Sequence, residues 1–294
     1  MASYDRSELH TGDAGYPACL AETPRPPRTL YVAGDPSALR LGLGVVGSRK
    51  ATPYGLACAQ RFAGWAAARG VTIVSGAAYG CDQAAQRAAL AAGGRTVAVL
   101  GCGADVDYPS GAADLLDTIR RDDAVVSELP WGSPPTKWAF PERNRIIAGL
   151  SAALLVVEAG LPSGTFSTAD HALDASRDVL AVPGSIFAPE CRGANRLIRQ
   201  GAFAVTDVSE LAEDLRSCGL LGALPDGGDF EQPQAAEESD PVARALLADP
   251  MRPDDLARAL AMDIIEVMRR LARLETAGVA HRYPDGRYGP GPRR

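Results

Sequence analysis

From about residue 43 onward, short apolar runs alternate with longer segments in which apolar residues recur every three or four positions. The short runs hold four to eight residues, are rich in Val, Ile, Leu and Ala, and mostly end at Gly or Ser, as buried strands do. They read LGVVG, VTIVSG, TVAVLG, AVVSEL, ALLVVEAG, DVLAVPG and AFAVTD. This alternation predicts a doubly wound, mostly parallel α/β sheet over residues 43–223, with residues 1–42 as an extension packed on it.

The first helix of this region is the most clearly marked. Thr52 can cap its N-terminus, Pro53 stands at the first helical position, and Gly70 closes it. Apolar residues spaced by three or four positions between these markers are expected to face the core.

Small and polar residues collect where the predicted strands end. Ligands of doubly wound sheets bind beyond the carboxyl ends of the strands, and small residues there let a ligand approach the backbone closely. One such turn could merely end a strand, but five along one edge favour a binding site. They are Gly47-Ser48-Arg49, Ser75-Gly76, Gly101-Cys102-Gly103, Glu158 to Thr165 and Pro183-Gly184-Ser185.

The stretch from Trp138 to Ala169 combines an aromatic, Arg-bearing loop with a buried strand that ends in Ser163-Gly164-Thr165. Backbone N–H groups at a helix start, preceded by cations, can hold phosphates in a row. Aromatic rings beside them suit the stacking of bases. The block therefore points toward a nucleic acid rather than a single mononucleotide.

Several common sites are excluded by their spacing. GLGVVG at 42–47 matches the letters of a dinucleotide fingerprint, but its residues 43–46 are themselves the strand, whereas the fingerprint follows a strand. No P-loop motif occurs, and the six cysteines and three histidines are too scattered for a metal site or a catalytic triad. We expect reduced thiols, no metal and no cofactor.

Charge and hydropathy narrow the possible partners. The formal net charge of −6 argues against a protein that coats DNA indiscriminately, so any nucleic-acid site must be a local basic patch. The N-terminus is polar, and no run of about 18 apolar residues occurs. We expect a soluble, cytoplasmic protein without a membrane segment.

The chain changes character after residue 223. Residues 224–240 are rich in Gly, Pro and acids and read as a flexible linker, and residues 241–294 read as a small winged helix-turn-helix domain. Its longer helix, 264–276, carries an expected core stripe of Ile264, Val267, Met268, Leu271 and Leu274. Nine arginines against six acidic residues from 251 to 294 permit DNA contact, while docking to a protein stays an equal alternative.

At this level of detail the chain resembles a known family. GVVGSRKATPYG, SGAAYGCDQAAQRAAL, TVAVLGCGADVDYP, the FPERNRIIAGLS block, DVLAVPGS and GANRLIRQGA, in this order, are similar to the DNA-processing protein A (DprA/Smf) family over residues 16 to 215. The resemblance implies a Rossmann-like core without assigned catalysis. It also implies binding and protection of single-stranded DNA in natural transformation, loading of the RecA recombinase, and a homodimer.

The candidate DNA-binding residues lie in four groups. At the first strand end, Arg49 and Ser48 suit a phosphate, although Arg49 could instead pair with a carboxylate. Arg143 and Arg145 could clamp successive phosphates, or one of them could brace the loop, and Phe140 could stack on a base or pack in the core. The full set is Ser48, Arg49, Lys137, Phe140, Arg143, Asn144, Arg145, Ser163, Gly164, Thr165, Asn195 and Arg196.

Two residues depart from the family pattern, which commonly has an apolar residue, a basic residue and a His near Ala77, Tyr79 and Gln86: Tyr79 is not basic, and Gln86 removes the His that could have supported acid–base chemistry. Tyr79 could weaken phosphate binding or replace charge with stacking.

Two other functions stay open. A phosphoribohydrolase-like enzyme could use Glu158 as base, but Ala169 stands about where its catalytic Glu would be; a transcription regulator could use the winged helix.

Overall fold

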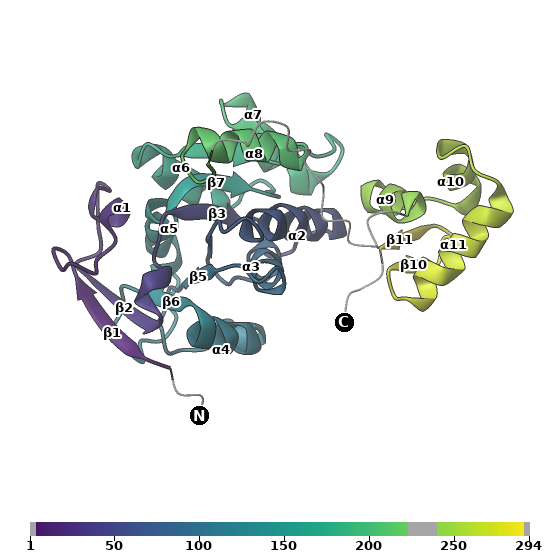
Figure 1. Cartoon of the computed structure of the whole chain (residues 1–294). Helices are drawn as coiled ribbons and strands as arrows, with labels where there is room; N and C mark the ends of the chain where they lie inside the picture. Colours follow the sequence, from purple (N-terminus) through teal and green to yellow (C-terminus); the bar gives the residue numbers. More distant parts are fainter. Residues whose placement is uncertain (1–3, 223–239, 291–294) are drawn as a thin grey trace. The chain divides into compact units, whose positions relative to one another are not determined.

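The computed structural model describes residues 4–222 and 240–290 (Figure 1). Contacts divide the chain into two compact units, Met1–Asp226 and Gly227–Arg294, which are considered separately. The linker expected at 224–240 lies, except for its last residue, outside the described residues.

A nine-stranded sheet in the order β1-β2-β6-β5-β4-β3-β7-β8-β9 forms the centre of the larger unit. Strands β3 to β9 are mutually parallel, whereas β1 and β2 pair antiparallel and extend the sheet beyond β6. The expected mostly parallel α/β fold is therefore confirmed. The strands are β1 (Arg6–His10), β2 (Thr29–Gly34), β3 (Gly42–Val46), β4 (Ile73–Ser75), β5 (Thr96–Val99), β6 (Ala124–Ser127), β7 (Ser151–Val156), β8 (Asp178–Ala181) and β9 (Phe203–Ala204).

Helices cover both faces of this sheet (Figure 1). One face packs against α2, α3, α4 and α8, and the other against α1, α5, α6 and α7. The longer helices are α2 (Pro53–Ala67), α3 (Cys81–Ala91), α4 (Ala113–Asp122), α5 (Ala139–Gly149), α6 (Thr165–Asp174) and α8 (Val208–Ser217); the shorter ones are α1 (Ala18–Ala21), α7 (Arg192–Arg199) and the single turns 36–38, 110–112 and 189–191.

Alternation along the strands separates the two cores. In β3, Leu43 and Val45 enter the core beneath α2 and α3, whereas Val46 enters the opposite core with Ile146 of α5. Successive side chains of a strand point to opposite faces, so a strand buried on both faces reads as a continuous apolar run. This is why the sequence runs identified the central strands.

The order of the parallel strands reverses between β3 and β7. Chain segments that leave these two strands turn in opposite directions and open a crevice at the carboxyl edge of the sheet. Glu158, two residues after β7, links the two sides of this crevice. Its carboxylate accepts hydrogen bonds from the Thr52 backbone N–H and hydroxyl at 2.9 and 2.8 Å. The N-terminus of α2 is thereby fixed at the edge, with Thr52 as its cap as expected.

In its described part, residues 240–290, the smaller unit has three helices and a two-stranded antiparallel hairpin, as a winged helix does. Val267, Leu271 and Leu274 of its last helix are buried, but Ile264 and Met268 are 38% and 45% exposed. The expected five-residue core stripe is therefore wrong at these two positions, because α9 and α10 cover only the other side of the helix. Its elements are α9 (Pro241–Ala248), α10 (Pro253–Ala259), α11 (Ile264–Thr276), β10 (Ala280–Arg282) and β11 (Tyr288–Pro290).

No helix in the described ranges is long and apolar enough to span a bilayer.

Candidate nucleic-acid interface

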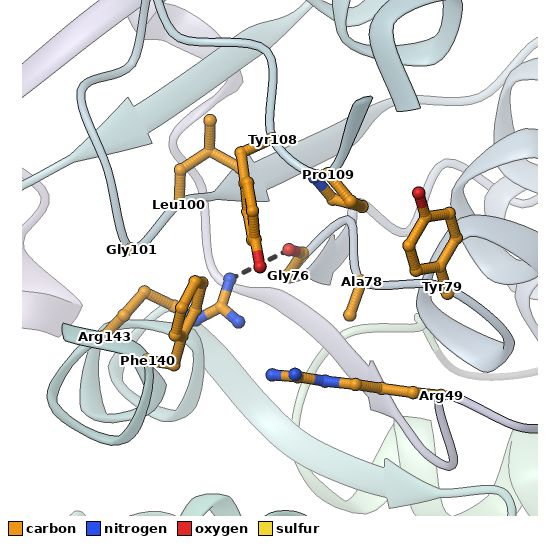
Figure 2. A pocket seen from close by; sticks show the side chains of 10 residues that line it. All are labelled: Arg49, Gly76, Ala78, Tyr79, Leu100, Gly101, Tyr108, Pro109, Phe140 and Arg143. Atoms are coloured by element: carbon orange, nitrogen blue, oxygen red, sulfur yellow. Dashed lines mark hydrogen bonds between the residues drawn. The ribbon is translucent and has the colours of Figure 1, made fainter. Parts of the chain in front are cut away.

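A pocket opens at the carboxyl edge of β3, β4 and β5, and the start of α5 closes one side of it (Figure 2). The Arg49 guanidinium carbon lies 5.5 Å from the centre of the Phe140 ring, and Tyr108 lies 5.4 Å from that ring at an angle of 33°. Cation and rings thus form a short row along the pocket. Its lining is Arg49, Gly76, Ala78, Tyr79, Leu100, Gly101, Tyr108, Pro109, Phe140 and Arg143.

Arg49 is the exposed cation of this row. It follows the last residues of β3 and extends into the pocket, toward the ring of Phe140 (Figure 2). Among the residues that the structure describes, no carboxylate pairs with it, so the alternative of a surface ion pair finds no partner there. An unpaired guanidinium beside an aromatic ring can contact a phosphate or stack on a base.

Phe140 is only partly buried, and its position depends on Gly101. A Cβ at residue 101 would lie 2.9 Å from the Phe140 ring, which a side chain could not occupy without displacing the ring. The glycine after β5 therefore makes room for an aromatic side chain at the edge of the sheet. Phe140 packs against Tyr108 and Gly101 outside the main core clusters, and its stacking on a base stays a prediction.

Arg143 lies beneath the pocket and is 5% exposed. It donates to the carbonyls of Gly76, at 2.9 Å, and of Val99, and so joins the ends of β4 and β5. The Asp82 carboxylate accepts from the Gly76 N–H at 3.1 Å. Gly76 is therefore held by Asp82 at its N–H and by Arg143 at its carbonyl. Burial lowers the pKa of Arg143 to about 10, which leaves the guanidinium charged at neutral pH.

Arg145 points to a different part of the surface. It pairs with Glu128 and, at 3.7 Å, with Glu142, and it lines a second small pocket with Arg25 and His171. The paired phosphate clamp suggested for Arg143 and Arg145 is therefore not formed. Residues two apart on a helix face different directions, and here one braces the sheet while the other is neutralised by carboxylates.

Asn144 and the β7–α6 loop make local bonds. Asn144 donates to Ser167 at 3.3 Å and so links α5 to α6. The Ser163 hydroxyl accepts from the Thr165 N–H at 3.2 Å in the turn before α6, while Gly164 is exposed. These residues lie on the expected edge of the sheet but do not line the Arg49 pocket.

Two further groups also lie outside that pocket. Asn195 binds both peptide groups of Gly184, at 3.1 and 3.0 Å, and so holds the loop after β8. Arg196 is exposed on α7, and Lys137 is exposed just before α5. Ser48 is partly exposed, and its hydroxyl accepts from the Lys50 N–H at 3.1 Å.

Tyr108 is an aromatic residue of the pocket that the sequence analysis did not single out. It is 38% exposed and belongs to VDYP, a segment that follows a glycine-rich strand end. An aromatic residue next to proline at such an end is the signal that could have found it. Tyr79, noted only as a departure, also lines the pocket, is 48% exposed and accepts from the Gly111 N–H at 3.3 Å.

Neither Glu158 nor Gln86 is placed for acid–base work at this pocket. Glu158 is 1% exposed, burial raises its pKa, and both its oxygens bind Thr52. Gln86 is fully buried and donates to the Thr96 hydroxyl and the Val97 carbonyl, away from the carboxyl edge. The interpretation that Glu158 orders the neighbouring loop is thus confirmed. Ala169 lies in the core.

Comparison with known proteins agrees with this architecture. Residues 8–216 match the family model of DNA recombination-mediator protein A, and residues 229–286 match the DprA winged helix domain. Protein Smf of Escherichia coli is 40% identical over 92% of this chain and 74% of its own length. DNA processing protein DprA of Bacillus subtilis is 37% identical over 73% of this chain and 74% of its own.

Two solved structures are also similar. DNA processing protein A from Streptococcus pneumoniae superposes with a TM-score of 0.68 at 38% identity, covering 72% of this chain and 74% of that one. The Helicobacter pylori protein, whose structure concerns its single-stranded DNA binding mode, gives 0.66 at 28% identity over 73% of this chain and 97% of that one. With the parallel sheet, the edge pocket and the winged helix, these matches establish that the chain belongs to the DNA recombination-mediator protein A family, DprA/Smf.

Proposed function

We propose that this chain binds single-stranded DNA at the carboxyl edge of its sheet, with Arg49 on phosphate and Phe140 and Tyr108 against a base. The observation that carries the proposal is the exposed Arg49 guanidinium, without an ion pair among the described residues, over the partly open Phe140 ring. Single-stranded DNA offers both a charged backbone and unpaired π-faces, and this pocket has a group for each. Duplex DNA buries its base faces and matches the pocket less well.

The biological role follows from the family. A recombination mediator would protect incoming single strands during natural transformation and help load the RecA recombinase, acting in the cytoplasm as a homodimer. We propose all of this for the present chain, together with the absence of catalysis. Support for the last point comes from Glu158, which is occupied by Thr52, and from Ala169, which is buried and has no acidic group.

Titration of the full chain with labelled single-stranded and duplex DNA of equal length tests the proposal. Tighter binding of the single strand, weakening as salt rises, is the expected result, because phosphate contacts release counterions. Filament formation by purified RecA on the same strand should then become faster when the chain is present. Hydrolysis of a nucleoside monophosphate would instead support the phosphoribohydrolase alternative, and equal affinity for both DNA forms would contradict the proposal.

The winged helix is the basis of a second candidate role, because α11 exposes Ile265 to 70% as well as Ile264 and Met268. Several arginines of this unit are engaged with carboxylates, including Arg258 with Asp255 and Arg269 with Glu266. An apolar face with neutralised cations suits protein docking better than the reading of DNA bases. We therefore favour docking over the transcription-regulator alternative for this domain.

A further inference from the structure

A tight turn after β8 presents two large apolar side chains to solvent. The Ala188 N–H donates to the Ser185 carbonyl at 3.1 Å, and the Ser185 hydroxyl accepts from the Phe187 N–H at 3.3 Å. Ile186 and Phe187 occupy the two central positions and are 76% and 87% exposed. Such positions usually carry Gly, Asn, Asp, Pro or Ser, so an adjacent Ile and Phe require an explanation.

The turn is anchored at its base. The Asn195 side chain binds both peptide groups of Gly184, and the Tyr54 hydroxyl donates to the Pro183 carbonyl at 2.7 Å. The exposure of Phe187 therefore belongs to a held loop. Leaving such a side chain in water forgoes the free energy of burying it, which points to a ligand that covers it.

Two arginines follow this turn within a few residues along the chain. Arg192 and Arg196 are exposed on α7, one helical turn apart and hence on one side of it. Within the described residues neither has an ion-pair partner, and the nearest acid in sequence, Glu190, precedes them in the turn 189–191. An exposed ring next to unpaired guanidinium groups is the combination that single-stranded nucleic acids bind.

The turn and the Arg49 pocket lie on the same edge of the sheet. Strand β8 is separated from β4 by β3 and β7, which corresponds to about 14 Å at a spacing of about 4.8 Å between neighbouring strands. A single strand held at the pocket can cross this distance within the roughly 4 to 16 nucleotides that a single-strand-binding domain occupies. Both features therefore lie within reach of one DNA strand.

We propose that Phe187 is a second base-stacking platform for the strand bound at Arg49, with Arg192 and Arg196 on its phosphates. The inference rests on the proposed function, because it extends the same DNA across the β3–β7 crevice. Charge favours this occupant over a protein, since the apolar turn continues into an unpaired basic helix side. Phe187 supplies stacking, and Ile186 flanks it.

The test measures affinities of the full chain for a thymidylate dinucleotide, which is too short to span the distance of about 14 Å, and for an oligothymidylate of about 20 nucleotides. Phe187→Ala should weaken binding of the long strand roughly 5- to 100-fold and leave the short one unchanged, because only the long strand reaches both platforms. Phe187→Tyr should restore the affinity, whereas Phe187→Leu should not, since it retains apolar volume but has no ring. The matched control is Leu173→Ala, which removes an apolar side chain 62% exposed on α6.

The outcomes separate the two proposals. If Phe187→Ala leaves the long strand as tightly bound as in the parent chain, or if Phe187→Leu binds as well as Phe187→Tyr, the platform is overturned while binding at Arg49 stands. Altered oligomeric state in Phe187→Ala with unchanged DNA affinity would likewise overturn it and assign the turn to a protein. If the parent chain binds neither oligonucleotide, the proposed binding of single-stranded DNA is itself contradicted.

Discussion

The guanidinium of Arg49 lies 5.5 Å from the centre of the Phe140 ring, although the two residues belong to motifs far apart in the chain. Arg49 follows β3, and Phe140 belongs to the first turn of α5, which precedes β7. Strands β3 and β6 run parallel in one sheet and α5 follows β6, so Arg49 and the start of α5 both lie at the carboxyl edge. The pocket is thus a consequence of the sheet topology.

Tyr79 should contribute stacking at the position where the family resemblance led us to expect a basic residue. We expect Tyr79→Ala to weaken single-stranded DNA binding by about 1–3 kcal/mol without changing its salt dependence, because the ring carries no charge. Tyr79→Arg should steepen the dependence of log affinity on log salt by about 0.7, the value for one added phosphate contact. Anisotropy titrations at several salt concentrations measure both quantities. Unchanged affinity in Tyr79→Ala would show that the ring only packs on Gly111.

Substitution of Arg143 should lower the free energy of unfolding, because this side chain braces the sheet beneath the pocket. Its removal leaves the Gly76 and Val99 carbonyls and the buried Asp82 carboxyl without their cation. Each buried carbonyl left without its hydrogen-bond donor costs about 1–3 kcal/mol, so chemical denaturation should show Arg143→Ala destabilised by about 2–6 kcal/mol. An Arg49→Ala variant, altered at an exposed position, serves as the comparison and should unfold as the parent does. A stable Arg143→Ala that binds no DNA would contradict the bracing role.

Asp214 on α8 should make stability depend on pH. Burial and the neighbouring Asp178, Glu210 and Glu213 raise its pKa from 3.8 to about 6. The folded chain then holds this proton more tightly than the unfolded chain, so stability is lost as pH rises from about 4 to about 6. Asp214→Asn should flatten that part of the profile and raise stability at neutral pH. Equal slopes for parent and variant in pH-dependent thermal unfolding would refute the assignment.

The sequence predicted the sheet well because its strands are buried on both faces and read as apolar runs. It could not predict the different fates of Arg143 and Arg145. Both look like exposed cations beside Asn144, and only the packed structure shows one beneath Gly76 and the other paired with Glu128. Burial of a charge depends on partners distant in sequence, which periodicity along the chain does not reveal.

In the winged helix, too, the spacing of apolar residues did not reveal which of them are buried. Helical spacing placed Ile264 and Met268 with Val267, Leu271 and Leu274, but the neighbouring helices cover only the last three. A stripe of apolar residues shows which side of a helix is apolar. How much of that side is buried depends on the elements packed against it.

The central claim is that Arg49 binds single-stranded DNA, and a matched pair of arginines tests it most directly. Arg49 follows β3 at its carboxyl end, whereas the exposed Arg40 precedes β3 at the opposite edge. Each substitution by Ala removes one positive charge from a residue that flanks β3, so the net charge changes equally. Affinity of the full chain for single-stranded DNA should fall at least about 10-fold in Arg49→Ala, with a salt slope shallower by about 0.7, and stay near the parent value in Arg40→Ala. Equal losses in the two variants, or none in Arg49→Ala, would contradict the account.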